Sequence, residues 1–358
     1  MAAATITTSE ASDDTSEDVR APAARWLDEA RAELVDGGGA RPGTLLGDAV
    51  REVVASMALA VRADAVALVD SLVRSSEELV RTHEGRSLRP WIDDARALVV
   101  SSAPVAARPL LLALLANMER AAECGASTSS SHLRPGSPSY GVARAYLDAL
   151  LRADRRGASQ VVRAALASGT SLRDLYVDVF APVQREVGRL WQRGEISIAD
   201  EHFCTAATQL VMSQLYEQLF DGARRQATLV ATSAPGDLHE VGIRIIADFF
   251  EMRGWDTVYL GASTPASAVA DAVVQHRASV LAVSATLSSH VEGVRAVVQE
   301  VRARARGVPV LVGGSPFQTA PELVRYVGAD ATASSPEEAI RAAEALTMGE
   351  APTMGSVR

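Results

Sequence analysis

From about residue 226 the chain alternates short apolar runs with amphipathic stretches, and this alternation constrains the fold more than any other feature. The runs are rich in Val, Leu and Ala and cover residues 228–232, 256–260, 279–284, 308–312 and 329–333. Each run has the length of a buried strand, and each intervening stretch can hold one helix. This repeat predicts a five-stranded, doubly wound parallel sheet within a Rossmann-like domain over residues 226–348.

Earlier in the chain the hydrophobic period is helical. Residues 21–124 predict an N-terminal helical domain, in which glycines end a first helix and the later helices cover about 44–81, 91–100 and 108–122. Residues 139–222 predict a four-helix bundle with helices over about 141–153, 158–167, 172–193 and 198–220. The expected fold class is therefore α + α/β, with the sheet domain following two helical parts.

Two other segments have the composition of irregular chain. Residues 1–20 are mostly small, polar or acidic and predict a disordered tail, because a signal peptide would carry a basic start and an apolar run. Residues 125–138 are rich in Ser and contain two prolines, which is typical of a linker.

Charge and residue usage exclude several classes of function. The net charge of -9 and the pI of about 5.3 argue against a nucleic-acid-binding surface. All 35 basic residues are Arg, which excludes a Schiff-base lysine and a phosphate-loop lysine. Only two cysteines occur, as expected in a reducing cytoplasm. The most apolar stretch, residues 97–118, is broken by Ser, Pro and Arg, so we expect no membrane span.

The segment Asp237-Leu238-His239-Glu240-Val241-Gly242 lies between the first predicted strand and the first helix of the sheet domain. A histidine at such a turn can reach a metal in a cleft. A carboxylate two residues earlier can hold its second ring nitrogen and so fix the tautomer. Two simpler interpretations remain open: Asp237 caps the helix, and His239 is an ordinary surface residue.

Further polar and small residues stand at the ends of later predicted strands. Ser284 and Thr286 follow the third run, and Gly313-Gly314 follow the fourth. Ligands of doubly wound sheets bind at these carboxyl ends. In order and spacing, this set together with residues 237–242 resembles the cobalamin-binding domain of methionine synthases, mutases, corrinoid proteins and cobalamin photoreceptors.

The resemblance implies a role for each of these residues. His239 would bind the cobalt of cobalamin from below, with Asp237 accepting its other N–H, and Gly242 would let the helix start close to the cofactor. Ser284 and Thr286 would line the slot for the nucleotide tail, although the family often has Leu where Thr286 stands. Gly313-Gly314 would leave room for that tail.

A second set of residues lies across the last turn of the predicted bundle. Trp191 is followed after nine residues by Glu201-His202, with Ile198 between them. This spacing resembles the upper cap of cobalamin-dependent photoreceptors, in which Trp stacks on the adenosyl group and the Glu-His pair frames it. Adenosylcobalamin is then the implied cofactor. The alternative is that Trp191 is a core residue and that Glu201 only favours the helix dipole after a Ser197 cap.

The sequence departs from the carotenoid-type photoreceptors at two places. They carry a cobalt-binding His directly after the Trp, where this chain has Gln192. They also begin with a winged-helix DNA-binding domain, whereas residues 21–124 resemble the helical front end of photocobilins, which also hold a bilin. Biliverdin is therefore a further expected cofactor. Its contacts cannot be aligned, and chemistry alone points to Trp26, His83, Trp91 and Cys124, each of which also reads as an ordinary helix or loop residue.

These features predict a cytoplasmic light sensor rather than an enzyme. It would signal through a homo-oligomer or an effector protein in trans, without binding nucleic acid or a membrane. Two alternatives stay open: a corrinoid methyl-carrier for a methyltransferase, and a cobalamin sensor without photochemistry. A mutase is disfavoured, because the chain leaves no room for a catalytic barrel.

Overall fold

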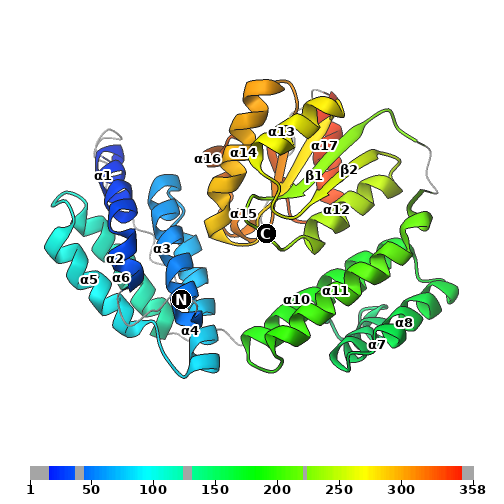
Figure 1. Ribbon diagram of the computed structural model, residues 1–358, viewed down its shortest axis with the longest axis horizontal. Helices are drawn as coiled ribbons and strands as arrows, with labels where there is room; N and C mark the ends of the chain where they lie inside the picture. Colours follow the sequence, from blue (N-terminus) through cyan, green and yellow to red (C-terminus); the bar gives the residue numbers. More distant parts are fainter. Residues whose placement is uncertain (1–15, 37–43, 124–130, 221–223, 349–358) are drawn as a thin grey trace.

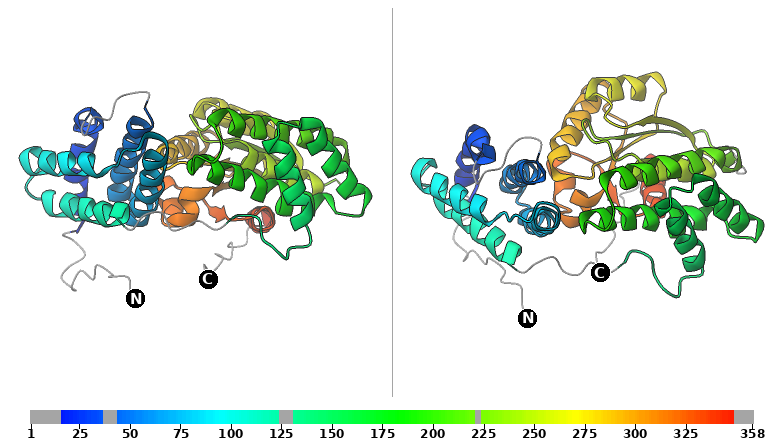
Figure 2. Two further views of the ribbon diagram at one scale, coloured as in Figure 1. Left: turned by 90° about the horizontal axis from the view of Figure 1, so that it is seen from below. Right: turned by 60° about the horizontal axis from the view of Figure 1, so that its bottom comes forward.

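The computed structural model describes residues 16–36, 44–123, 131–220 and 224–348. They form three bodies: an N-terminal helical domain, a helical bundle and a sheet domain (Figure 1). Figure 2 shows the bundle lying along the sheet domain, with the N-terminal domain to one side. The predicted fold class is confirmed. The described residues leave out three predicted features: residues 1–15 of the tail, residues 125–130 of the linker, and Cys124.

The N-terminal domain is built from six helices among the described residues. They are α1 (Ser16–Glu29), α2 (Arg31–Asp36), α3 (Leu45–Ala63), α4 (Val66–Glu84), α5 (Arg89–Ser102) and α6 (Arg108–Glu123). The long helical pattern predicted over about 44–81 is divided into two helices, because the chain turns at Asp64 (φ 57). Asp tolerates this left-handed conformation. The apolar pattern continues across the turn because α3 and α4 both face the domain's core. α1 begins inside the tail predicted over residues 1–20.

The bundle follows the predicted order of helices. It comprises α7 (Tyr140–Leu151), α8 (Arg155–Ala167), α9 (Leu172–Asp174), the π-helix η2 (Leu175–Phe180), α10 (Ala181–Gln192), α11 (Ile198–Gln214) and the 3-10 helix η3 (Tyr216–Phe220). The π turn has a local cause. Pro182 has no N–H to donate within the helix, and Ala181 bonds to the carbonyl of Tyr176, five residues earlier.

The sheet has five parallel strands in the order β2-β1-β3-β4-β5. They are β1 (Thr228–Ser233), β2 (Asp256–Gly261), β3 (Val280–Ser284), β4 (Val310–Gly313) and β5 (Ala331–Ala333). The predicted runs are confirmed to within about two residues at each end. The order changes direction between β1 and β3, which creates the crevice where such sheets bind ligands.

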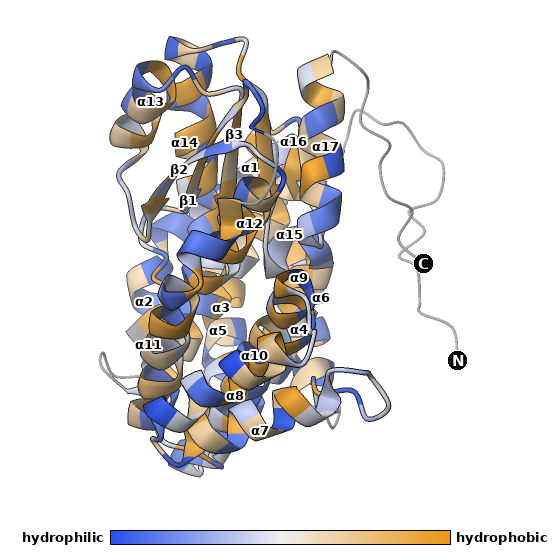
Figure 3. Cartoon of the chain, turned by 90° about the vertical axis from the view of Figure 1, so that its right-hand side faces the viewer, coloured by the Kyte–Doolittle hydropathy of each residue, from blue (hydrophilic) through white to orange (hydrophobic). Residues whose placement is uncertain are grey.

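Helices cover both faces of this sheet. The connecting helices are α12 (Val241–Met252), α13 (Ala266–Gln275), η4 (Ser288–His290), α14 (Val291–Arg304), α15 (Ser315–Thr319), α16 (Leu323–Val327) and α17 (Pro336–Met348). One apolar core joins α12, α17 and the bundle, and a second joins α13, α14 and α16. Figure 3 shows hydrophobic residues along the strands between these layers. None of the described helices combines the length and apolar character needed to cross a membrane.

A buried polar contact joins the bundle to the sheet domain. Tyr176 of η2 donates a hydrogen bond to Oδ2 of Asp248 on α12 at 2.7 Å, and its ring packs edge-on against Phe249. Burial raises the pKa of Asp248 to about 6, and the hydrogen bond from Tyr176 and the charge of Arg244 oppose that rise only partly. Asp248 therefore carries a desolvated charge at neutral pH.

We expect Asp248→Asn to stabilise the protein at pH 7. The native carboxyl takes up its proton near pH 6 and the unfolded one near its ordinary pKa of 3.8, so the contribution of Asp248 is unfavourable above pH 6 and vanishes below about pH 4. The variant should gain about 1–3 kcal/mol at pH 7 and little at pH 4. Urea unfolding at both pH values measures this. Asp256→Asn, at an exposed carboxylate, is the matched control. Equal gains at both pH values would contradict the assignment.

Candidate functional site

The carboxyl ends of four strands form one row at the crevice. Ser233 pairs with Ser284, Ser284 with Gly313, and Gly313 with Ala333. The three segments singled out in the sequence follow β1, β3 and β4, which are adjacent strands. Residues more than 70 positions apart in the chain therefore meet at one edge of the sheet.

The Asp237–His239 pair has the geometry predicted for a held metal ligand. Asp237 is fully buried, and its Oδ1 accepts hydrogen bonds from the His239 backbone N–H at 2.9 Å and from Nδ1 at 2.8 Å. The imidazole is 59% exposed. Because Nδ1 is occupied by Asp237, Nε2 is the nitrogen available to a ligand in the crevice.

The electrostatics of this pair stabilise the charged form of the carboxylate. Burial opposes ionisation of Asp237, but hydrogen bonds from His239, His290 and Thr286 outweigh it and hold its pKa well below the ordinary value. The hydrogen bond to Asp237 raises the pKa of His239 against burial, and the charges of Asp237 and Glu201 raise it further. A permanently ionised Asp237 makes the imidazole a better donor to a metal.

Two residues that hold Asp237 were not identified as such from the sequence. The backbone N–H of Thr286 donates to Oδ2 of Asp237 at 2.6 Å, and Nδ1 of His290 lies 3.4 Å from the same oxygen. Thr286 was singled out for its hydroxyl, whereas the structure uses its backbone. His290 carries no recognisable local pattern, and only the return of the chain after β3 brings it to Asp237.

The interpretation of Asp237 as a helix cap is wrong. α12 begins at Val241, its N-cap residue is Glu240, and no side chain caps it. The Glu240 carboxylate instead accepts hydrogen bonds from Gln209 of the bundle at 2.7 Å and from Tyr259 at 3.0 Å. Glu240 thus links bundle and sheet. Leu238 projects outward, 76% exposed, beside His239.

The predicted glycines differ in why a side chain would be unfavourable at each position. A Cβ on Gly242 would meet no atom within 4 Å, so only a ligand could crowd it. Gly314 has φ +105, and a Cβ there would lie 1.9 Å from the Ala285 carbonyl oxygen. The backbone itself therefore requires glycine at position 314, a reason that is separate from the predicted room for a tail. At Gly313 a Cβ would lie 3.2 Å from the Ala333 oxygen.

Ser284 carries an unused polar atom at this edge. Its Oγ is buried and has no hydrogen-bond partner among the described residues. Leaving a buried hydroxyl unsatisfied costs about 1–3 kcal/mol. A polar group bound in the crevice beside β3 and β4 would remove that cost, which fits the tail slot predicted for Ser284.

The predicted cap residues lie on the bundle's last turn. Trp191 is half-buried at the end of α10, so the interpretation as a plain core residue is wrong. Glu201 and His202 bond to each other at 2.7 Å, and the His202 side chain is 72% exposed. Ile198 is 51% exposed although it is apolar. Ser197 does cap α11, in a capping box with Asp200, and Glu201 lies in the first turn of α11, so the alternative role of Glu201 in favouring the helix dipole stays open.

These side chains fit a cobalamin between the bundle and the sheet. His239 offers one free nitrogen, Ser284 an unsatisfied hydroxyl and Gly242 open space. Leu238 and Ile198 offer exposed apolar surface, as a corrin ring needs on its faces. Gln209 of α11 bonds to Glu240, the residue after His239, at 2.7 Å, which places the bundle beside the predicted lower ligand.

Comparison with known families agrees with this site. Residues 227–344 match a B12 binding domain, and residues 142–216 match a second B12 binding domain. The matched ranges coincide with the sheet domain and the bundle. These two domains indicate a cobalamin-binding family.

Individual relatives come from two groups. The HTH-type transcriptional repressor CarA of Myxococcus xanthus is 30% identical over 165 residues, which are 46% of this chain and 55% of CarA. The chain thus matches about half the length of this relative. Monomethylamine corrinoid protein 1 of Methanosarcina acetivorans is 23% identical over 195 residues, covering 52% of this chain and 88% of that protein.

A solved structure shares the fold. The monomethylamine corrinoid protein of Methanosarcina barkeri has a TM-score of 0.52 at 21% identity, covering 59% of this chain and 99% of its own. At this identity the match supports the architecture of bundle and sheet domain. It adds nothing about the N-terminal domain.

The residues considered for a bilin fall into different places. Trp91 is buried and its Nε1 donates to the Leu34 carbonyl at 2.6 Å, and Trp26 is buried with its Nε1 3.2 Å from Ser102 Oγ. Both are core residues of the N-terminal domain, which agrees with their alternative interpretation as ordinary helix residues. His83 lies elsewhere, on the surface that faces Trp191.

Proposed function

We propose that the protein is a light sensor that binds adenosylcobalamin between the bundle and the sheet domain. Adenosylcobalamin supplies a cobalt–carbon bond that visible light breaks. His239, oriented by Asp237, would hold the lower face, and Ser284 would receive the nucleotide tail. Trp191, with Ile198, would cover the upper adenosyl group.

The observation that supports the proposal is that two sets of side chains lie on two bodies that contact each other, the bundle and the sheet domain. The bundle carries a half-buried indole and a Glu-His pair, and the sheet domain carries a histidine held by a buried carboxylate. An adenosyl group needs an aromatic face and polar anchors, and Trp191 and the Glu201–His202 pair provide them. A simple methyl-carrier needs neither.

Signalling would follow from the loss of contact at Trp191. Once the adenosyl group is gone, the Trp191 indole has no surface to pack on. It then no longer stabilises the closed arrangement, in which the bundle lies against the sheet domain with the cofactor between them. The equilibrium between closed and open arrangements then shifts, because only contacts that differ between two states can change their populations. The output would be a change of assembly or an effector protein in trans, in the cytoplasm and without an enzymatic reaction.

The test is an absorbance spectrum of the purified protein with adenosylcobalamin, in the dark and after green light. The proposal requires a histidine-ligated dark spectrum that changes on illumination. Trp191→Ala should keep that ligation and lose about tenfold of the preference for adenosylcobalamin over methylcobalamin, the scale of one aromatic contact. A bound but light-inert spectrum would refute the light-sensing function.

The identity of residue 192 gives a separate prediction. Gln192 is exposed next to Trp191, and an amide is a poor cobalt ligand. We expect no bis-histidine spectrum after illumination of the unchanged protein, and we expect Gln192→His to produce one. Absorbance before and after light measures this. A bis-histidine spectrum that is present in the unchanged protein and vanishes in Gln192→Ala would contradict it.

The second candidate function is a corrinoid methyl-carrier for a methyltransferase. Its support is the match to a corrinoid protein over 88% of that relative's length. This function predicts tighter binding of methylcobalamin than of adenosylcobalamin and no effect of light. A cobalamin sensor without photochemistry would prefer adenosylcobalamin and still be light-inert. The spectra and the two affinities therefore separate all three functions.

A bilin as second chromophore extends the main proposal. Its support is the layout of an N-terminal helical domain before the bundle. Addition of biliverdin should then produce a long-wavelength absorbance band that persists in His239→Ala, since that change affects only the cobalamin site. The absence of such a band would remove biliverdin from the proposal and leave the cobalamin function untouched.

A further inference from the structure

Two consecutive helices of the N-terminal domain contact both the bundle and the sheet domain, the two bodies proposed to hold cobalamin. We call residues 45–84, which comprise α3 and α4, the α3–α4 hairpin. It lies between the rest of the N-terminal domain and the other two bodies (Figure 1). It contacts α10 of the bundle as well as η4 and α15 of the sheet domain. No other part of the described N-terminal domain has such extensive contacts with both.

On the bundle side the contact is made to Trp191 itself. Nε2 of His83, near the end of α4, donates to the Trp191 carbonyl oxygen at 2.7 Å, and the two ring centroids lie 6.0 Å apart. The next turn of the bundle is equally close. A Cβ added to Gly194 (φ +65) would lie 2.8 Å from Cγ2 of Thr82. The end of α4 is therefore fitted against the residue predicted to cover the adenosyl group.

On the sheet side the contact reaches the shell around the lower ligand. Oε1 of Glu52 on α3 accepts the backbone N–H of Ser289 in η4 at 3.0 Å. The next residue, His290, lies 3.4 Å from the Asp237 carboxylate that holds His239. Three residues therefore connect Glu52 of the hairpin to His239, the predicted cobalt ligand: Ser289, His290 and Asp237.

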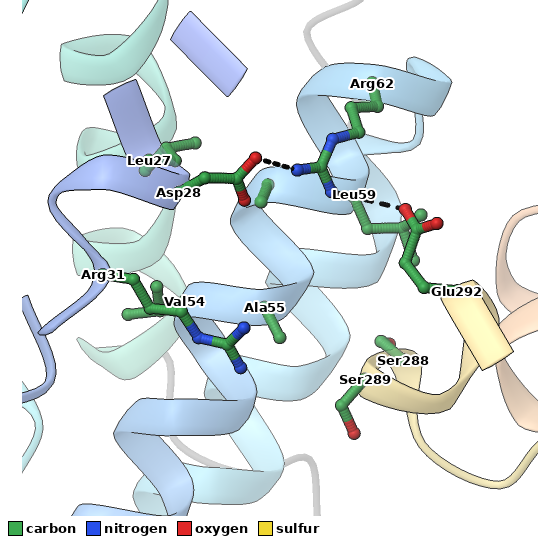
Figure 4. Close-up of a pocket in the computed structure, with 11 residues that line it drawn as sticks. Leu27, Asp28, Arg31, Val54, Ala55, Leu59, Arg62, Ser288, Ser289 and Glu292 are labelled. Carbon is green, nitrogen blue, oxygen red and sulfur yellow. Dashed lines mark hydrogen bonds and ion pairs between the residues drawn. The ribbon is translucent and has the colours of Figure 1, made fainter. Parts of the chain in front are cut away.

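The contact between the hairpin and the sheet domain has a well-packed part and a cavity beside it. Leu59 and Leu68 share an apolar core with Phe317 of α15, and Nη1 of Arg62 lies 3.3 Å from Glu292. A cavity of about 130 Å³ lies between α1, α3 and η4, with Val54 among the residues that line it. Figure 4 shows the charged and apolar side chains around it. The hairpin is therefore attached to the sheet domain by a buried apolar core, with incomplete packing beside it.

We infer that the α3–α4 hairpin senses the separation of bundle and sheet, with His83 as the positioning residue for Trp191. This inference rests on the proposed function. The hairpin is attached to Trp191 at one end and to η4 at the other. A movement of the bundle relative to the sheet strains one attachment or breaks it. The N-terminal domain thereby becomes the element that converts the state of the cofactor into a change elsewhere.

Hydrogen–deuterium exchange of the full chain tests the inference. Three states are compared: without cofactor, with adenosylcobalamin in the dark, and with adenosylcobalamin after green light. We expect exchange in α4 and in residues 288–292 to differ between states, together with exchange in α10. In His83→Ala the difference in α10 should remain and the difference in α4 should be lost. His276→Ala, at an exposed histidine on the far end of α13, should behave as the unchanged protein.

A steric variant provides an independent check. Gly194→Ala places a methyl group against Cγ2 of Thr82 and should also uncouple α4 from α10. Adding Thr82→Ser removes that carbon and should restore part of the coupling. Full rescue is not expected, because the positive φ of Gly194 still strains alanine.

The outcomes separate the two proposals. Exchange in α4 that is equal in all three states, while α10 responds, overturns the inference and leaves the light-sensing function intact. The same is true if His83→Ala keeps the α4 response. A response of α4 to adenosylcobalamin but not to light supports the inference and refutes light sensing. Failure of adenosylcobalamin to bind overturns both.

Discussion

Replacing His239 by alanine is expected to abolish the histidine-ligated spectrum of bound cobalamin and to weaken binding by more than about 100-fold. Loss of an outer-shell partner already costs about 10–100-fold, and the ligand itself contributes more. In the described structure its Nε2 is the nitrogen left available, since Asp237 holds Nδ1 at 2.8 Å. Equilibrium binding followed by absorbance measures both effects.

A graded series makes this expectation specific. Asp237→Asn keeps the size of the side chain but removes its charge, and it should weaken binding by about 10–100-fold while retaining histidine ligation. His276→Ala changes an exposed histidine away from the crevice and should have no effect. If His239→Ala binds cobalamin with unchanged affinity and spectrum, the assignment of the lower ligand is wrong.

Replacing Gly314 by alanine is expected to destabilise the fold by about 3 kcal/mol or more. The new Cβ would lie 1.9 Å from the Ala285 carbonyl oxygen, and φ is +105. Left-handed strain costs about 1–3 kcal/mol, and overpacking adds about as much. For a chain of this size the melting temperature should fall by roughly 10 °C, as measured by thermal unfolding without cofactor.

Gly242→Ala is the matched control for this change. A Cβ there would meet no protein atom within 4 Å, and the residue lies in the first turn of α12. Stability without cofactor should be unchanged or rise slightly, because alanine favours a helix. Cobalamin binding should weaken by about tenfold, since one methyl group enters the space of the cofactor. Equal effects of the two variants on stability would contradict this distinction.

Much of the fold was predictable because it depends on local patterns. Each strand is a short run of Val, Leu and Ala, so its period and length are visible in the sequence. The segment from Asp237 to Gly242 was recognisable for the same reason, since one turn holds the whole motif. The break at Asp64 was missed, because a single left-handed residue does not disturb the apolar pattern on either side.

Contacts between distant segments were not predictable. His290 reaches Asp237 only because β3 lies beside β1. His83 reaches Trp191 across 108 positions, and neither residue has a neighbouring signal for that contact. The requirement for glycine at position 314 likewise comes from the Ala285 carbonyl on the neighbouring strand's loop.

The sequence by itself determined the order of helices and strands and the chemistry of the crevice, because periodicity and short motifs act within one or two turns of chain. Only the tertiary structure decided which side chains share the Asp237 carboxylate and that Glu240 fastens the bundle to the sheet. It also decided that the N-terminal domain contacts both the bundle and the sheet domain. Such contacts depend on how the three bodies pack against one another. Packing depends on complementary shapes and hydrogen bonds, and the number of residues between two partners in the sequence does not reveal it.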